Sequence, residues 1–138
     1  MAARRIDVRL KLPEEFGGRW RKAGERLKAM SLLMESGALD TAVMVGIQSA
    51  IAAADAFTIR HLGKYCVSER HEDVVALVES VPRVAGVAEA SHHLKRLIVH
   101  KSVIEYSERY PLPVEAENLC RHARRFVEFV GRNLKPGV

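Results

Sequence analysis

The sequence predicts an all-α protein, an up-down antiparallel bundle of four to five helices preceded by a short extended arm. Apolar residues recur at steps of three and four along most of the chain, which is the spacing of one helix face. Gly37, Gly63, Pro82 and the segment 111–113 interrupt these patterns. Because the connections between the resulting helices are short, sequential helices are expected to pack antiparallel.

We divide the chain into the arm, residues 1–12, and the bundle, residues 13–138. Within the arm, residues 5–12 alternate charged and apolar side chains strictly, which is a β-strand pattern. A lone strand is not stable by itself. The arm is therefore either flexible or packed on the bundle or on a second copy of the chain.

The first two helices are expected on either side of Gly37. The first begins at Pro13, because proline suits the first helical position. The second begins at Asp40 or Thr41, both good capping residues, and ends at Gly63. It is apolar on nearly every side, so it should be the central, most buried helix. Small residues along it would let its neighbours approach closely: Ala42, Gly46, Ala50, Ala53 and Ala54.

Three further helices are expected in the second half of the chain. Ser68 should cap the third helix, which Pro82 ends. The fourth starts within residues 83–87 and reaches roughly Arg109, and the fifth starts in the proline-containing segment 111–113.

Composition and charge allow several partner classes. The net charge is +5, which suits an anionic partner such as RNA, DNA or a nucleotide, although the basic residues are scattered and equally fit an ordinary solvated surface. Cys66 and Cys120 form no CxxC pair, and the first residues lead into no apolar segment. Together these features predict a cytoplasmic protein with reduced thiols and without a membrane span.

Charged residues on two helix seams are the candidates for a functional site. Asp55 lies in the middle of the apolar second helix, where a carboxylate needs a partner or its pKa rises until it is neutral. It is either a hydrogen-bonded polar group of the core or an acid lining a site. Lys101 occupies a seam of the fourth helix and could pair with Glu105 or Asp55, or extend its charged end to solvent.

Tyr106 and the histidines are weaker candidates. Tyr106 lies about 140° around the helix from Lys101, so the two could meet only across a wide cleft or one formed by two chains. His71 follows the second helix and could serve a site, pack or lie on the surface. The six histidines show no metal-binding spacing, so no metal or cofactor is expected.

Short motifs stand out in helices two to five, namely residues 49–56, 60–63, 69–71, 93–97 and 101–106, with Arg109 behind the last of them. They resemble motifs of the HEPN superfamily, over roughly residues 20–134. The match is closest to a bacterial subgroup that has a lysine and a Glu-Tyr pair at the last of these positions.

The resemblance implies a helical bundle that usually dimerises. Many members are metal-independent ribonucleases, often toxins of toxin–antitoxin or defence systems. They share an Arg, four to six intervening residues and a His, and two copies meet across the dimer cleft. Here Lys101 and Tyr106 take these positions. Lysine lacks the bidentate fork of arginine, and tyrosine is a poor general base at neutral pH.

Three functions follow from this sequence. The first is a dimeric HEPN-like module with a degenerate catalytic motif. It would bind RNA, a nucleotide or a protein partner such as an antitoxin, in a toxin–antitoxin, defence or RNA-processing context. The second is a ribonuclease toxin that uses Lys101 and Tyr106 as catalytic residues. The third is a structural adaptor without a ligand site. The residues expected to line the binding site are Asp55, His71, Glu105 and Arg109.

Overall fold

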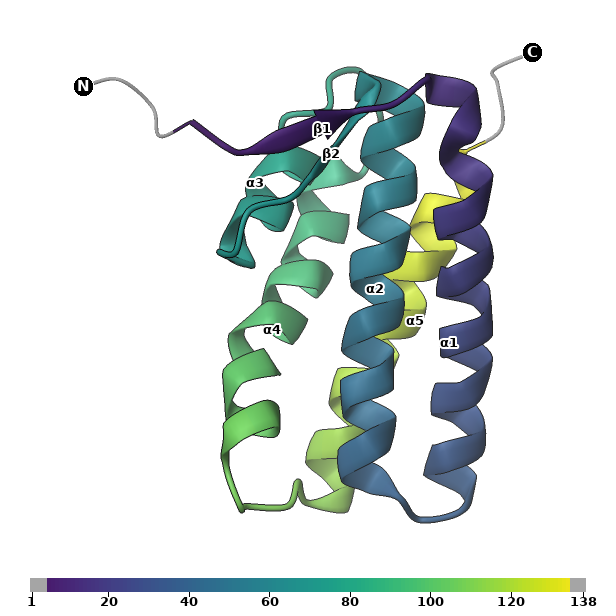
Figure 1. The fold of residues 1–138 in the computed structure, drawn as a ribbon. Helices are drawn as coiled ribbons and strands as arrows, with labels where there is room; N and C mark the ends of the chain where they lie inside the picture. Colours follow the sequence, from purple (N-terminus) through teal and green to yellow (C-terminus); the bar gives the residue numbers. More distant parts are fainter. Residues whose placement is uncertain (1–4, 135–138) are drawn as a thin grey trace.

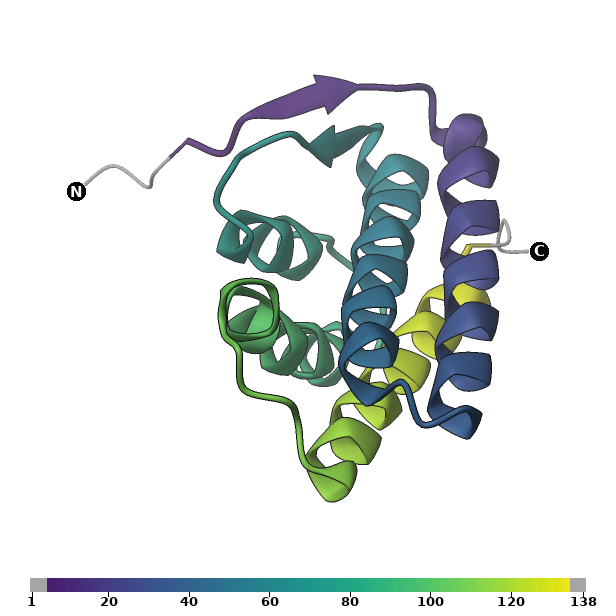
Figure 2. The ribbon, with the colours of Figure 1, turned by 60° about the horizontal axis from the view of Figure 1, so that its bottom comes forward.

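Four long helices stand side by side in this computed structural model, which describes residues 5–134. They are α1 (Gly17–Glu35), α2 (Leu39–Leu62), α4 (Val87–Tyr106) and α5 (Pro113–Arg132). Each runs antiparallel to the one before it, and the short helix α3 (Glu72–Glu79) precedes α4 (Figure 1). Figure 2 shows α2 between α1 and α4, with α5 behind it. The predicted all-α, up-down bundle of four to five helices is confirmed, with five helices in the described residues.

The arm folds onto its own chain. Strand β1 (Val8–Leu10) pairs antiparallel with β2 (Lys64–Cys66), and the two-stranded sheet crosses one end of the bundle (Figure 1). Backbone hydrogen bonds of 2.9 Å extend the pairing on both sides, from the amide of Lys11 to the carbonyl of Gly63 and from Val67 to Asp7. Of the alternatives for the arm, the structure shows packing on the bundle. Residues 1–4 lie outside the described residues.

Helix α2 is the buried centre of the bundle, as its composition predicts. Its small residues admit the neighbouring helix closely, since a Cβ added at Gly46 would lie 2.6 Å from the sulfur of Met30 in α1. The Ser49 hydroxyl, buried in the same interface, donates a 2.6 Å hydrogen bond to the Ala23 carbonyl. A larger residue at position 46 would therefore require the buried Met30 side chain to move.

Helix α2 is also long and apolar enough, by length and composition alone, to cross a membrane. In the bundle, 78% of that apolar stretch is buried. Its hydrophobicity is thus accounted for by packing against other helices, which fits the core helix of a folded bundle.

Several predicted helix ends are wrong by a few residues. A 3-10 turn over Pro13–Phe16 precedes α1. Asp40 lies inside the first turn of α2 and caps nothing, because the helix begins one residue earlier. The Ser68 hydroxyl accepts from the Arg70 amide and donates to the carboxylate of Asp73, so it organises the turn before α3 without capping the helix. Helix α4 ends at Tyr106, since Ser107 is extended.

Candidate functional site

Lys101 and Glu105 form the first part of the candidate site, on the C-terminal half of α4. Four residues apart on one helix, they lie on the same face, and Lys101 Nζ donates to Glu105 Oε1 at 2.6 Å. The Lys101 side chain is only 13% exposed, so its aliphatic stem is packed against the bundle while its ammonium group reaches Glu105. Position 101 is a seam position, as predicted.

Two further groups act on the Glu105 carboxylate. The pKa of Glu105 is lowered, first by the hydrogen bond and charge of Lys101, and then by the positive charge of His71 and a hydrogen bond from the Tyr106 side chain. His71 comes from the segment before α3, whereas the other three residues belong to α4. Glu105 therefore gathers a lysine, a histidine and a tyrosine around one ionised carboxylate. We call these four residues the α4 cluster.

Asp55 belongs to a second, separate cluster at the other side of α2. Its carboxylate accepts from Arg19 of α1 at 3.2 Å, and the guanidinium of Arg19 lies 4.5 Å from the centre of the Tyr65 ring in β2. Burial raises the pKa of Asp55 to about 7, although the charge of Arg19 opposes this. Both outcomes expected of a carboxylate in this helix, a partner and a raised pKa, are present. The structure gives Lys101 a different partner, Glu105, and so does not join Asp55 to the α4 cluster.

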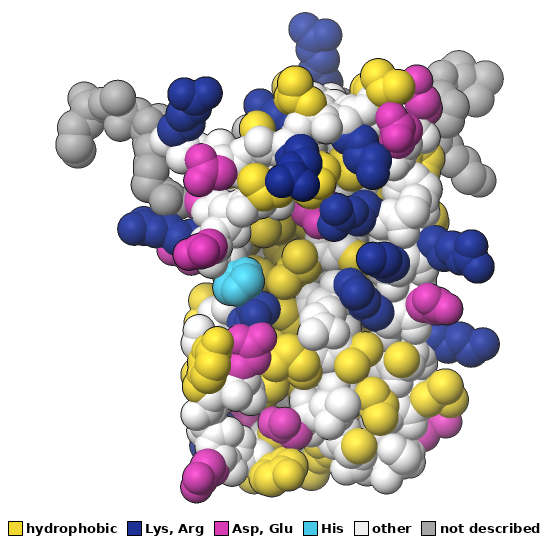
Figure 3. Space-filling view, in the orientation of Figure 1, with side chains coloured by type: hydrophobic (Ala, Val, Ile, Leu, Met, Phe, Trp, Pro, Cys, Tyr) yellow, Lys and Arg dark blue, Asp and Glu magenta, His cyan; other side chains and the backbone are white. Residues whose placement is uncertain are grey.

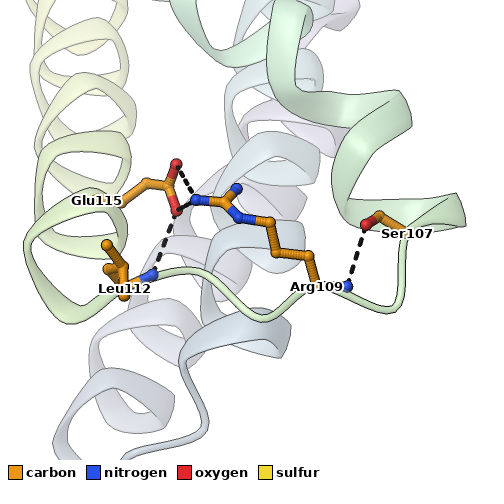
Figure 4. Close-up of polar contacts among 4 residues, drawn as sticks. All are labelled: Ser107, Arg109, Leu112 and Glu115. Carbon is orange, nitrogen blue, oxygen red and sulfur yellow. Dashed lines mark hydrogen bonds and ion pairs between the residues drawn. The ribbon is translucent and has the colours of Figure 1, made fainter.

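Arg109 lies in the connection between α4 and α5, where it binds Glu115 (Figure 4). Its guanidinium donates to both carboxylate oxygens, at 3.2 and 3.4 Å. The same carboxylate accepts the backbone amide of Leu112 at 3.2 Å, and the Ser107 hydroxyl accepts the amide of Arg109. These contacts stabilise the start of α5. Arg109 is therefore bound within the connection between α4 and α5 and is not part of the α4 cluster.

The structure thus brings four of the six predicted site residues together and leaves Asp55 and Arg109 apart. Sequence reasoning missed Arg19 and Tyr65 as partners of Asp55. It also missed a contact between His93 of α4 and His122 of α5, whose Nδ1 atoms are 2.8 Å apart. Both contacts join residues that are far apart in the sequence, so no local sequence pattern predicts either of them.

The α4 cluster is suited to binding an anion. The Lys101 ammonium group binds the Glu105 carboxylate, which also feels the charge of His71, and a phosphate oxygen could replace that carboxylate as the partner of Lys101. Among residues 5–134, no three His, Cys, Asp or Glu side chains are arranged to hold a metal ion. Tyr106 is 83% exposed, so nothing in the described chain desolvates its hydroxyl for proton transfer.

Basic side chains gather on one face of the molecule. Figure 3 shows them over the sheet and the adjoining end of α1 and α2. A groove of about 710 Å³ runs there, lined among others by Arg9, Lys11 and Tyr65. The positive net charge is therefore concentrated in part on this face, which scattered positions in the sequence do not reveal.

Comparison with known proteins gives one family. A family model described as HEPN domain matches residues 18–134, which include all five helices apart from the first residue of α1. No match was found among curated proteins.

Proposed function

This chain belongs to the HEPN domain family, and from that premise we propose that it is a dimeric, cytoplasmic module that binds RNA or a nucleotide. The α4 cluster is the proposed binding site, and toxin–antitoxin, defence or RNA-processing systems are the proposed context. The observation that carries the proposal is Lys101, whose side chain is packed into the bundle while its ammonium group is held by the Glu105 carboxylate. A phosphate group would compete with Glu105 for Lys101.

The same geometry favours binding over efficient cleavage. Lys101 offers a point charge in the place of the family's arginine and cannot hold a phosphate bidentately. Tyr106 takes the place of the histidine, and its side chain is engaged with Glu105. A tyrosine is a poorer general base than a histidine at neutral pH. The motif is accordingly proposed to be degenerate.

An exposed apolar stripe on α4 supports dimerisation. Val99, Val103 and Tyr106 lie at steps of four and three on one face of the helix, and Tyr110 follows in the connection. All four side chains are exposed. A run of exposed apolar residues along one helix face is a candidate interaction surface. Pairing of two such stripes would place two copies of the α4 cluster beside one interface.

RNA binding can be tested with two lysines of α4. Lys95 is exposed and Lys101 is the cluster lysine, so Lys95→Met and Lys101→Met remove the same charge from the same helix. We expect Lys101→Met to weaken binding of a fluorescent single-stranded RNA, measured by anisotropy, by about tenfold or more, and Lys95→Met by about twofold at most. Equal losses in both variants would mean that only net charge matters, and the proposed site would be wrong.

Dimerisation can be tested with two exposed apolar residues. Val103→Glu places a charge in the exposed apolar stripe on α4, whereas Leu32→Glu places a charge at an exposed apolar position of α1. Light scattering of the purified chain is expected to show a dimer that Val103→Glu alone converts to a monomer. A monomeric wild-type protein, or a dimer that survives Val103→Glu, would contradict the proposed interface.

A ribonuclease toxin remains the second candidate, because Lys101 and Tyr106, although far apart around the helix, both act on Glu105. Such an enzyme would arrest growth when expressed in a bacterial host and would cleave RNA after purification. Tyr106→Phe should then abolish cleavage and preserve RNA binding. Absence of both growth arrest and cleavage would eliminate this candidate.

The structural adaptor is the third candidate. It is favoured by the observation that Asp55 and Lys101 each have an ion-pair partner within one chain. An adaptor would bind a partner protein, such as an antitoxin-like chain, and would show no RNA affinity that depends on Lys101.

A further inference from the structure

Three of the six histidines meet between α4 and α5, away from the α4 cluster. The ring centres of His93 and His122 are 5.1 Å apart, and those of His92 lie 6.2 and 6.3 Å from the two. Helix α4 packs along α5 here (Figure 2), and His93 and His122 are partly buried between them. The proposed function assigns no role to these side chains.

The contact between the two rings depends on protonation. At 2.8 Å, the Nδ1 atoms of His93 and His122 share a hydrogen bond, so one nitrogen carries a proton and the other supplies a lone pair. If both imidazoles were fully protonated, two N–H groups would face each other and the hydrogen bond could not form. The contact therefore requires at least one neutral ring. When the second Nδ1 atom is also protonated, the hydrogen bond is lost and the two nitrogens move apart.

The surroundings of the pair are strongly basic. Burial lowers the pKa of both histidines, and cationic neighbours lower it further: His92 and Arg125 act on His93, and His93, Arg96, His92 and Arg121 act on His122. The opposing group is Glu89, which raises the pKa of His93. A metal cation would be repelled by this set of charges, whereas an anion would be attracted and would favour protonation of the rings.

The charges that line an adjoining cavity of about 710 Å³ indicate where such an anion would bind. Arg125 and Arg132 line it together with Glu89 and Glu128, so its acidic and basic groups balance. The excess of positive charge lies at the histidine end, where Arg96 and Arg121 stand near His122. An anion is therefore expected between the rings and not in the middle of the cavity.

We propose that His93 and His122 form a phosphate-binding site that is loaded by proton uptake. A phosphate oxygen inserts between the two Nδ1–H groups and accepts from both, in place of the hydrogen bond between the rings. Arg96, Arg121 and Arg125 bind the remaining phosphate oxygens from the two helices. The phosphate belongs either to a polynucleotide backbone or to a small free anion, and the chemistry of the site is the same for both.

Calorimetry on the full chain tests this proposal. Inorganic phosphate, and in parallel sulfate, whose own charge does not change in this range, are titrated at about pH 5.5 and about pH 8 in two buffers with different heats of ionisation, so that protons taken up by the protein on binding are counted. We expect binding about tenfold or more tighter at the lower pH, with uptake of about one proton or more. No binding at the lower pH, or binding without proton uptake, would overturn the proposal.

Variants show whether the two histidines are responsible. The double variant His93→Gln, His122→Gln should lose both the binding and its pH dependence, while His100→Gln, further along α4, should keep both. If the double variant does not fold, NMR titration of the wild-type imidazoles replaces it, and phosphate should raise the pKa of His93 and His122. The proposal would be contradicted by unchanged phosphate binding in a folded double variant, or by imidazole pKa values that do not change when phosphate is added.

A short RNA identifies the source of the phosphate. If the site takes a polynucleotide backbone, the double histidine variant should weaken RNA binding in the Lys101→Met background, where the α4 cluster no longer contributes. If it takes a small anion, phosphate binding should be lost while RNA binding in that background is unchanged. If the double histidine variant loses neither phosphate binding nor RNA binding, the proposed site is wrong.

Discussion

In the two ion pairs that involve α2 and α4, the carboxylate is buried in one pair and partly exposed in the other. Asp55 contacts Arg19 at 3.2 Å and is 9% exposed, whereas Glu105 contacts Lys101 at 2.6 Å and is 29% exposed. Burial raises the pKa of Asp55, while the hydrogen bond to Lys101 leads the lowering of the pKa of Glu105. An opposite charge at hydrogen-bond distance therefore does not decide which form of a carboxyl group is favoured, because the loss of water can outweigh it.

This difference separates the roles of the two clusters. The Asp55 pair lies beneath the sheet, where Arg19 also rests on Tyr65, and its energetics are tied to folding. In the α4 cluster, Glu105 is ionised and partly exposed, so Lys101 and His71 can exchange it for a ligand anion without unfolding anything. The variants below test this division, from the largest expected effect to the smallest.

Asp55→Asn should change how stability depends on pH. The folded protein holds the Asp55 proton more tightly than the unfolded chain, with a pKa of about 7 against 3.8. Its contribution to the free energy of unfolding therefore falls as pH rises from about 4 to about 7, by about 4 kcal/mol in total. Asparagine removes this titration, so the variant should gain stability relative to wild type across that window in urea unfolding. Parallel pH profiles would contradict the raised pKa.

Arg19→Met should destabilise the bundle at about pH 8, where Asp55 is ionised. Removing one partner of a buried pair typically costs about 3–5 kcal/mol, but Arg19 is one-third exposed, so we expect about 2 kcal/mol, including the contact with Tyr65. The loss should shrink near pH 5, where Asp55 is neutral. Arg21→Met, on the exposed side of α1, is the matched control and should change stability little. An equal loss at both pH values would show that packing and not charge is responsible.

Glu115→Ala should cost about 1 kcal/mol, because the Leu112 amide and Arg109 lose their acceptor at the start of α5 (Figure 4). Glu117→Ala removes an exposed acid two residues later and should be nearly neutral. Thermal unfolding followed by circular dichroism distinguishes the two. RNA binding should survive in both variants, and a selective loss in Glu115→Ala would place Arg109 in the binding site after all.

Local patterns predicted the helices but not what they contact. The steps of three and four and the glycine and proline breaks located all five helices, since these features depend on neighbours within a few residues. Asp55 was correctly marked as unusual, yet its partner lies 36 residues away in α1, on a helix whose polar face offers several basic residues. His93 and His122, 29 residues apart, meet only because α4 packs on α5.

The helix ends show a second kind of limit. Ser68 is a good capping residue by type, but its hydroxyl donates to the Asp73 carboxylate five residues later, so a competing contact within the same turn overrides the capping preference. The predicted site contained all four residues of the α4 cluster, but it also contained Asp55 and Arg109, which the fold places elsewhere. Which of the six candidates lie together depends on helix packing, and the sequence does not specify that packing.

A urea unfolding curve of Lys101→Met at neutral pH tests the division between the two clusters most directly. Methionine keeps the packed stem of the side chain and removes only its charge. If the α4 cluster serves a ligand, the free energy of unfolding should lie within about 0.5 kcal/mol of wild type, because the variant keeps the packed stem and the lost charge faces a partly exposed carboxylate four residues away on the same helix. A loss of about 2 kcal/mol or more would make Lys101 a structural residue and remove the basis for the proposed binding site.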